Sequence, residues 1–436
     1  MINFPAVVEA AQSEALIAVR GRVSQVIGMV IEGQMPGIPV GSICMIDVDR
    51  GNNKVAAEVV GFREGTTLLM PLGSMRGVEP GSGIHFVDKE AKVPVSSALL
   101  GRVIDGLGRP IDDKGPLDTE QYYPLYADPL NPLEREGIAE PLDVGVRAIN
   151  GLLTLGKGQR IGIMAGSGVG KSTLIGMIAR HTAADVSVIA LIGERGREVK
   201  DFIEKELGPE GMARSVLVVV TSDSPSLVRM RGAYLAMAIS EFFRDQNRDV
   251  IMMMDSVTRF AMSGREVGLA IGEPPTSRGY TPSVFSQLPR LLERAGTCEN
   301  KGSITGIYSV LVEGDDMNEP VADAVRSIVD GHIILDRSLA GQGHYPAIEI
   351  TGSISRCMVD VVAEKHIKAA RRFLDIYSTY RRSEDLINIG AYARGSNPKI
   401  DQAIDMIDSF NDYLKQEVQT KVPLARSSRD LLDLTK

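Results

Sequence analysis

The chain has 436 residues, of which 44% are hydrophobic and 24% charged, enough for two or three globular domains. Its net charge of −8 disfavours a general nucleic-acid binder, because such proteins are usually basic. Three widely spaced cysteines exclude a disulfide framework and favour a reducing compartment. No stretch approaches the roughly 20 apolar residues of a membrane helix, and residues 1–5 do not begin a secretion leader, so only peripheral membrane association is expected.

Residues 1–90 are predicted to form short strands. Apolar and polar or small residues alternate over 19–23, 55–62 and 66–72, and glycine-containing turns separate these stretches. Many short strands at close spacing predict a small β-barrel, with a loose sandwich as the alternative.

Residues 91–360 alternate apolar runs with longer helical stretches. Runs that are apolar nearly throughout are typical of strands buried on both faces, and this alternation predicts a parallel sheet with helices on both sides. Ligands of such sheets bind where the strands end. The runs cover residues 161–164, 188–192, 216–220, 250–254, 304–312 and 332–335.

Residues 361–436 are predicted to be helical. Ala403, Ile407, Phe410 and Leu414 recur at helical spacing, and Pro398 marks the start of a new helix.

A phosphate-binding loop is the strongest chemical signal in the sequence. It follows an apolar strand and precedes a helical stretch over 174–180, as the motif requires. Glycines let backbone N–H groups surround phosphate oxygens, Lys171 reaches the β and γ phosphates, and the Ser172 hydroxyl is suited to Mg²⁺. Ala165 replaces the first glycine of the usual pattern, at a position that needs only to be small. The predicted nucleotide-binding residues here are Gly166, Ser167, Gly168, Val169, Gly170, Lys171, Ser172 and Thr173.

Two carboxylates follow other predicted strands. Asp255 ends the run 251–254, and a carboxylate beside a P-loop suits the magnesium ion, held through water. Glu194 lies after residues 191–193, where it can accept a proton from the attacking water. A capping acid and a solvated loop acid, respectively, are the alternatives. Local pattern does not mark Arg356 or Tyr345, for which a surface arginine and a packing aromatic are the alternatives.

Longer strings resemble a known family. Residues 193–198, 255–260 and 344–348 resemble the catalytic β subunit of rotary ATP synthases. The resemblance is closer still to the flagellar and type III secretion export ATPases, on residues 268–285 and 390–395. It extends over nearly the whole chain and its motifs are specific. A dense acidic cluster typical of synthase β subunits is missing from 383–390, which favours the export branch.

The resemblance implies an α/β fold in three parts. These are an N-terminal β-barrel over 1–90, a central RecA-like P-loop sheet with flanking helices over 91–360, and a C-terminal helical domain over 361–436. It implies ATP hydrolysis with Mg²⁺ by a ring of six identical subunits that energises type III protein export for flagellum assembly.

The resemblance also implies roles that spacing does not show. Glu194 matches the glutamate that orients the hydrolytic water, and Arg195 matches a neighbour of the γ-phosphate. Arg356 matches an arginine finger that acts across a subunit boundary, and Tyr345 matches an aromatic that packs on adenine.

The implied partners are further copies of the chain, coiled-coil stalk and regulator proteins, an export gate, and export substrates with their chaperones, with no specific nucleic acid. The implied location is the cytoplasm, peripheral at the inner face of the cell membrane. About fifteen residues precede the first predicted strand, fewer than the regulator-docking segment of many flagellar relatives.

Three alternatives remain open. The first is the same activity in an injectisome. The second is an RNA-translocating ring ATPase, disfavoured by the acidic balance. The third is a non-catalytic rotary-ATPase subunit, disfavoured because such subunits typically lack the glutamate found here as Glu194.

Overall fold

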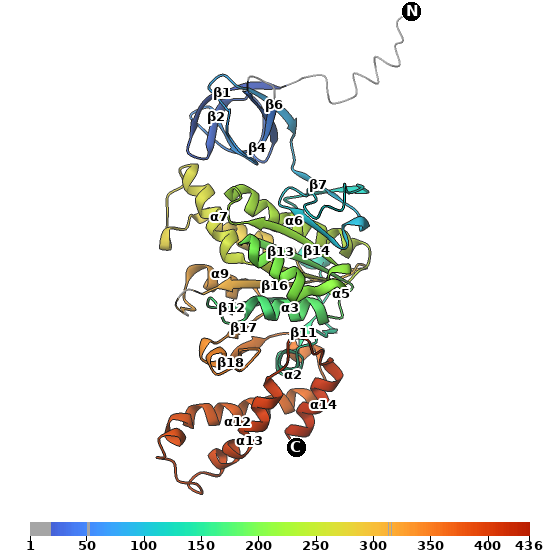
Figure 1. Ribbon diagram of the computed structural model, residues 1–436, viewed down its shortest axis with the longest axis vertical. Helices are drawn as coiled ribbons and strands as arrows, with labels where there is room; N and C mark the ends of the chain where they lie inside the picture. Colours follow the sequence, from blue (N-terminus) through green and yellow to red (C-terminus); the bar gives the residue numbers. More distant parts are fainter. Residues whose placement is uncertain (1–18, 50–52, 313, 315) are drawn as a thin grey trace, which may run out of the picture.

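The computed structural model describes residues 19–49, 53–312, 314 and 316–436. The described part forms three regions along one long axis: a β-barrel, a large sheet flanked by helices, and a group of helices (Figure 1). This arrangement confirms the predicted α/β class, with its N-terminal barrel, central RecA-like sheet and C-terminal helical region. The predictions made for residues 1–18 fall outside the described residues.

The barrel closes on itself through six antiparallel strands in the order β1-β2-β5-β4-β3-β6. Closure depends on β1, which pairs with both β2 and β6. Alternate side chains of β3, such as Cys44 and Ile46, are fully buried in the interior, as the two-residue period of a strand requires. The barrel is therefore confirmed over the sandwich. Its strands are β1 (Arg20–Ile27), β2 (Val30–Gln34), β3 (Ile43–Val48), β4 (Asn53–Arg63), β5 (Thr66–Pro71) and β6 (Gly83–Asp88).

The central sheet has eight strands in the order β18-β17-β12-β16-β15-β13-β14-β8. Every neighbouring pair is parallel except β17 and β18, which are antiparallel. The strands are β8 (Arg102–Asp105), β12 (Arg160–Ala165), β13 (Val186–Glu194), β14 (Ser215–Thr221), β15 (Val250–Asp255), β16 (Ile304–Leu311), β17 (Gly331–Leu335) and β18 (Ile348–Ser355).

Helices bury both faces of this sheet, which explains why its strands are apolar nearly throughout. Along β13, Val188 and Ala190 pack into the core on one face, and Ile189 and Leu191 into the core on the other. The helices of the region are α2 (Arg147–Leu152), α3 (Lys171–His181), α4 (Gly196–Asp201), α5 (Gly208–Ala213), α6 (Ser226–Asp245), α7 (Val257–Ala270), α8 (Pro282–Leu292), α9 (Pro320–Ile328) and α10 (Arg337–Gly341), and a π-helical turn covers Phe202–Leu207.

Smaller elements join the regions. Two short ladders pair β7 with β9 and β10 with β11, and the C-terminal helices pack around Phe373, whose ring stacks on Phe410 at 4.1 Å. These elements are β7 (Lys92–Val95), β9 (Gln121–Pro124), β10 (Pro141–Leu142), β11 (Leu155–Gly156), the 3₁₀ turns Ser97–Leu99, Pro132–Glu134 and Ser277–Gly279, and α11 (Met358–Val361), α12 (Glu364–Asn388), α13 (Pro398–Leu414) and α14 (Leu424–Leu434).

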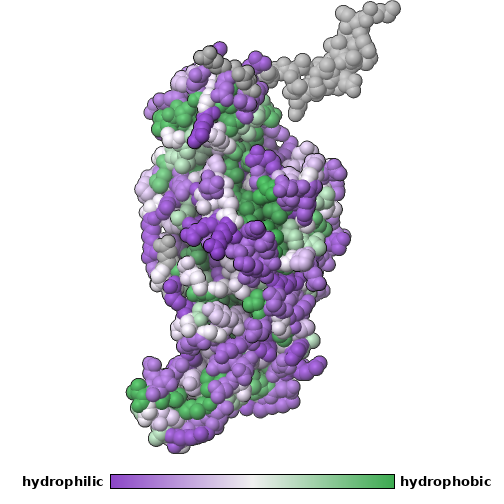
Figure 2. Space-filling view, in the orientation of Figure 1, coloured by the Kyte–Doolittle hydropathy of each residue, from purple (hydrophilic) through white to green (hydrophobic). Residues whose placement is uncertain are grey.

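Hydrophobic side chains are visible among hydrophilic ones over the barrel, over the central region and at the far end of α12 (Figure 2), where Leu386 and Ile389 are exposed. Within the described residues, no helix combines the length and the apolar character needed to cross a bilayer.

Candidate active site

The loop between β12 and α3 has the backbone of a phosphate-binding loop. Gly168 and Gly170 adopt φ values of 79° and 94°, in the left-handed region that strains other residues. No side chain caps α3, so the N–H groups of its first turn remain available to an anion. The loop therefore has a backbone shape that suits the predicted binding of phosphate.

Lys171 begins α3 and points its ammonium group into a cluster of carboxylates. Its Nζ forms an ion pair with Asp255 Oδ1 and lies 4.0 Å from Glu194 Oε1. Asp255 also accepts a 2.7 Å hydrogen bond from the Ser309 hydroxyl. The strand order explains the cluster, because β12, β15 and β13 all end at the same edge of the sheet.

Glu194 is set apart from an ordinary surface carboxylate by its pKa. Burial at the end of β13 and the negative charge of Asp255 raise the pKa of Glu194 to about 7, although Lys171 opposes the shift. A carboxyl group with this pKa exchanges a proton readily near neutral pH. The arrangement can therefore orient a water molecule and accept its proton.

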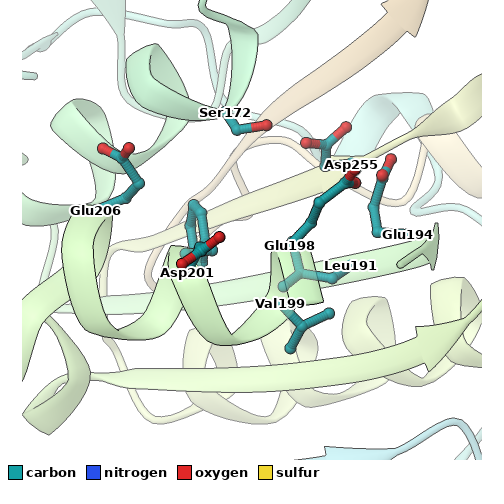
Figure 3. A pocket seen from close by; sticks show the side chains of 9 residues that line it. Ser172, Leu191, Glu194, Glu198, Val199, Asp201, Glu206 and Asp255 are labelled. Carbon is teal, nitrogen blue, oxygen red and sulfur yellow. The ribbon is translucent and has the colours of Figure 1, made fainter. Parts of the chain in front are cut away.

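Two adjoining cavities meet at these side chains. One, of about 370 Å³, is lined by the P-loop glycines, Lys171, Glu194 and Arg195. The other, of about 150 Å³, is lined by Ser172, Glu194 and Asp255. Figure 3 shows the hydroxyl of Ser172 and the carboxyl groups of Asp255 and Glu194 directed towards one another. The first cavity suits phosphates, and the second is acidic.

The oxygen atoms of Ser172 and Asp255 fit a magnesium ion. A hydroxyl and a carboxylate are hard ligands, and Mg²⁺ usually takes only one or two protein ligands beside waters and substrate phosphates. Among the residues that the structure describes, no cluster of three or more acidic, histidine or cysteine side chains forms a complete metal cage. These two protein donors would leave the other positions around the ion to water and to substrate phosphates.

Arg195 and Tyr345 border the P-loop. The Arg195 side chain lines the larger cavity, is 82% exposed and lies 3.7 Å from the carboxylate of Glu198. The ring of Tyr345 is half exposed and lies 3.7 Å from the point where a Cβ of Gly170 would stand. The structure thus places Tyr345 beside the P-loop, although it lies far from the P-loop in sequence.

Arg356 lies at the opposite edge of the same sheet. The first pair of the β17–β18 ladder joins Leu335 to Ile348, and the last joins Gly331 to Ser355. Leu335 pairs with Ala165, the residue just before the P-loop, whereas Arg356 follows the pair of Gly331 with Ser355. Five residues at about 3.3 Å each, or about 16 Å along the strands, therefore separate Arg356 from the level of Ala165. The exposed Arg356 therefore does not join the P-loop of its own chain.

Two charged residues at the site were missed by the sequence reasoning. Arg259 lines the larger cavity, with its side chain passing 3.0 Å from where a Cβ of Gly193 would stand, and Glu198 lines both cavities. Arg259 lies four residues after Asp255, and Glu198 four after Glu194, so each follows a strand-end carboxylate by about one helical turn. That spacing is the signal that could have revealed them.

Family comparisons agree with this geometry. The ATP synthase alpha/beta family matches with its nucleotide-binding domain over residues 145–355 and its beta-barrel domain over 23–87, and the T3SS EscN ATPase C-terminal domain matches 362–433. A flagellum-specific ATP synthase of Bacillus subtilis (strain 168) is 53% identical over 422 residues, covering 95% of each chain. The chain belongs to the family of flagellum-specific and type III secretion ATPases.

More distant relatives support the same assignment. A type 3 secretion system ATPase of Xanthomonas euvesicatoria is 48% identical over 396 residues, covering 91% of this chain and 89% of the relative. The assembled ATPase EscN from the enteropathogenic E. coli type III secretion system matches with a TM-score of 0.90 at 44% identity, covering 95% of this chain and 100% of EscN. As a member of this family, the chain is an ATP-hydrolysing enzyme.

Proposed function

We propose that this chain hydrolyses Mg-ATP at sites shared between neighbouring copies in a ring of six, and that the ring energises type III protein export for flagellum assembly. The observation that carries this proposal is the separation of Arg356 from the P-loop of its own chain. A catalytic arginine at the far edge of the sheet has a role only if the next copy presents its P-loop there. The similar EscN, whose structure was solved as an assembled ATPase, supports the ring.

Within one site the P-loop edge performs the chemistry. Residues 166–173 bind the phosphates, with Lys171 compensating their charge, and Tyr345 packs on the base. Glu194 orients the attacking water and takes its proton, a role suited to its raised pKa. Arg195 and the neighbour's Arg356 stabilise charge on the transferring phosphoryl group.

Magnesium belongs to the substrate complex. Ser172 would hold it directly and Asp255 through a water molecule, and the bound ion would neutralise phosphate charge. In the structure, Lys171 forms an ion pair with Asp255. With Mg-ATP bound, Lys171 would pair with phosphate and Asp255 would be left to hold the hydrated ion.

The ring is proposed to work in the cytoplasm, at the inner face of the cell membrane. Its proposed partners are a coiled-coil stalk, regulators, the export gate, and export substrates with their chaperones, and it needs no nucleic acid. The EscN structure solved with its central stalk EscO supports the stalk, and the exposed Leu386 and Ile389 offer apolar side chains for such a contact.

An injectisome is the second candidate system, favoured by the match to the T3SS EscN C-terminal domain. Recovery of the native complex from the source cell distinguishes the two. Flagellar stalk and gate proteins are expected with the chain, and injectisome components in their place would overturn the flagellar assignment.

Mixing experiments test the shared site. Alone, Lys171→Ala and Arg356→Ala should each lose ATP turnover, with Lys399→Ala as an exposed control that keeps it. In a mixture of the two inactive variants, some interfaces combine an intact P-loop with an intact Arg356, so turnover should return. Turnover that stays absent in verified mixed rings would contradict the shared site, and retained turnover in Lys171→Ala would contradict the P-loop assignment.

A further inference from the structure

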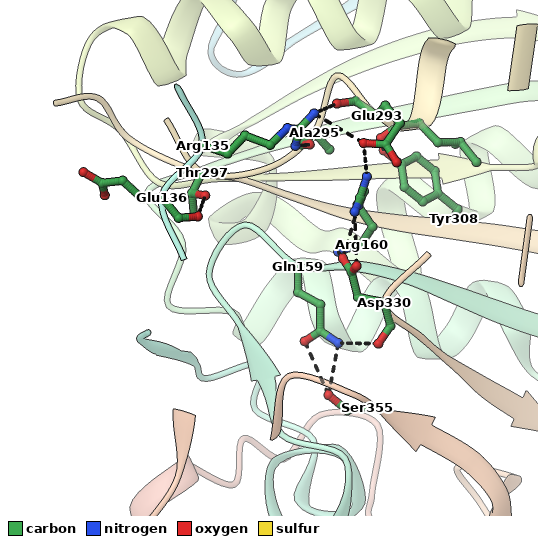
Figure 4. Close-up of polar contacts among 11 residues, drawn as sticks. Arg135, Glu136, Gln159, Arg160, Glu293, Ala295, Thr297, Tyr308, Asp330 and Ser355 are labelled. Atoms are coloured by element: carbon green, nitrogen blue, oxygen red, sulfur yellow. Dashed lines mark hydrogen bonds and ion pairs between the residues drawn. The ribbon is translucent and has the colours of Figure 1, made fainter. Parts of the chain in front are cut away.

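Next to Arg356 in the chain, at the edge of the sheet away from the P-loop, lies a connected set of buried and partly buried polar groups (Figure 4). Its members come from segments that are far apart in sequence: the start of β12, the residue before β17 and the end of β18. The guanidinium of Arg356 itself has no hydrogen-bond or ion-pair partner within the described part of the chain. Only its backbone is held, by a 3.0 Å hydrogen bond from Arg356 N–H to the carbonyl of Asp330.

Asp330 is in turn fixed by Arg160 at the start of β12. The carboxylate of Asp330 accepts three hydrogen bonds from Arg160, from the backbone N–H at 2.9 Å and from the guanidinium at 3.2 and 3.1 Å. Arg160 also forms an ion pair with Glu293. Burial acts to lower the pKa of Arg160, but the two carboxylates outweigh it and the pKa is raised. The pair is thus a stable support for the carbonyl that holds Arg356.

Ser355, the residue directly before Arg356, is fixed by a second set of contacts. Its hydroxyl donates to the carbonyl of Thr154 at 2.8 Å and accepts from the Gln159 side chain at 3.0 Å. Gln159 is fully buried, and its side-chain oxygen accepts from the N–H of Gly156 at 2.9 Å. The last residue of β18 is therefore tied to the loop that leads into β12.

The backbones approach closely at the same point. A Cβ added to Gly331 would lie 2.3 Å from the carbonyl oxygen of Ile354, closer than real side chains come. Glycine at this position lets β18 end directly against β17. The place from which Arg356 projects is thus defined by contacts on the residue before it and on its own N–H, while the side chain itself is free to meet a partner.

We infer that Ser355, Gln159 and Asp330 are positioning residues for Arg356, and that they act on the active site of the neighbouring copy rather than on that of their own chain. This inference rests on the proposed shared site. A long side chain without partners samples many rotamers, so Arg356 loses conformational entropy when it binds phosphate. A fixed backbone position reduces this loss, which is why the exposed arginine depends on the support. One chain would therefore contribute to two sites through β12, which leads to its own P-loop at one end and supports Arg356 at the other.

The test uses the full-length chain and Ser355→Ala, with Ser353→Ala as the matched control. Ser353 lies two residues earlier in β18, and among the described residues its hydroxyl bonds only to the Ile334 N–H and the Glu349 carbonyl, both within β17 and β18. Ser355→Ala should lower turnover about tenfold, because it leaves the buried Gln159 amide and the Thr154 carbonyl without this partner, with nucleotide affinity changed less than twofold. Ser353→Ala should leave both unchanged. Mixing Ser355→Ala with Lys171→Ala should raise turnover above the sum of the two separate samples.

The outcomes separate the inference from the proposed function. If Arg356→Ala recovers on mixing with Lys171→Ala but Ser355→Ala does not, the shared site stands and the positioning role is wrong. If neither recovers, the shared site fails and the inference falls with it. Unchanged turnover in Ser355→Ala overturns the inference directly. If Ser355→Ala does not assemble, Gln159→Met removes the same support from the other side and must give the same recovery.

Discussion

The two edges of the central sheet differ in how their charges are balanced. At the P-loop edge, one cation, Lys171, faces two carboxylates, Asp255 and Glu194, and burial together with the negative charge of Asp255 raises the pKa of Glu194 to about 7. At the other edge, two cations, Arg160 and Arg135, form ion pairs with two carboxylates, Asp330 and Glu293, so the charges are matched. The first edge is incomplete without a ligand, whereas the second is complete and serves to hold a chain segment in place. Partial compensation therefore marks the reactive edge.

Loss of the arginine at the supporting edge should have the largest effect. Arg356→Ala is expected to lower turnover by about 10³–10⁵, the range typical of an arginine finger. Because Arg356 is exposed and its side chain has no described partner, thermal stability should not change. Steady-state turnover and thermal unfolding check this, with the exposed Arg372→Ala as control. A turnover loss below tenfold would show that Arg356 does not act as an arginine finger.

At the P-loop edge, Glu194→Gln should lower turnover by about 10²–10⁴ while nucleotide still binds, since the amide keeps the shape but cannot accept a proton. Fluorescent nucleotide titration and turnover on the same sample separate binding from chemistry. Normal turnover in this variant would assign activation of the water to another group, of which Glu198 is the nearest candidate by its place in both cavities.

The raised pKa of Glu194 predicts a pH dependence with a definite sign. Below about pH 7 the group is protonated in the free enzyme and cannot accept a proton, so kcat/KM should rise with pH, up to about tenfold per unit, and level off above 7. The profile of Glu194→Gln should lack this step. A wild-type profile that is flat from pH 5.5 to 8 would show that ionisation of Glu194 does not limit the reaction.

Exposed charges that neither the P-loop site nor the support of Arg356 uses should matter least. Glu140 is 70% exposed and pairs with Lys157 at 2.7 Å, while Lys157 keeps a second partner in Asp249 at 2.8 Å. Glu140→Gln should change turnover less than twofold and the free energy of unfolding by less than about 1 kcal/mol. Denaturant unfolding and turnover measure both. A large loss of turnover would mean that functional charge extends beyond the P-loop site and the support of Arg356.

Local sequence pattern predicted where the residues of the P-loop edge lie, but it did not predict the residues that support Arg356 at the other edge. The P-loop, Asp255 and Glu194 each follow an apolar run, and strand ends gather at one edge of a parallel sheet, so local pattern predicted that they lie together, while the matched role of Glu194 came from the family resemblance. Tyr345 and Arg356 stand at either end of β18, and only its antiparallel pairing with β17 brings one to the P-loop and takes the other away. The sequence around either residue does not reveal this long-range register, so the roles proposed for both residues come from the resemblance to a family.

The barrel and the support of Arg356 illustrate the same limit. Strand periodicity predicted the strands of the barrel, but its closure depends on β1 pairing with β6, some sixty residues later in the chain. Gln159, Asp330 and Ser355 carry no motif, and their connection exists only once three separate segments meet. Arg259 and Glu198 could have been predicted from the sequence, because each lies four residues after a strand-end carboxylate.

The dependence of turnover on protein concentration tests the central claim most directly. If each site needs Arg356 from a neighbouring copy, turnover per chain should be near zero where sedimentation shows monomers and should rise steeply as rings form. Arg356→Ala should stay near zero over the whole range while still forming rings. Constant turnover per chain, extending into the monomer range, would show that one chain holds a complete site and would contradict the account.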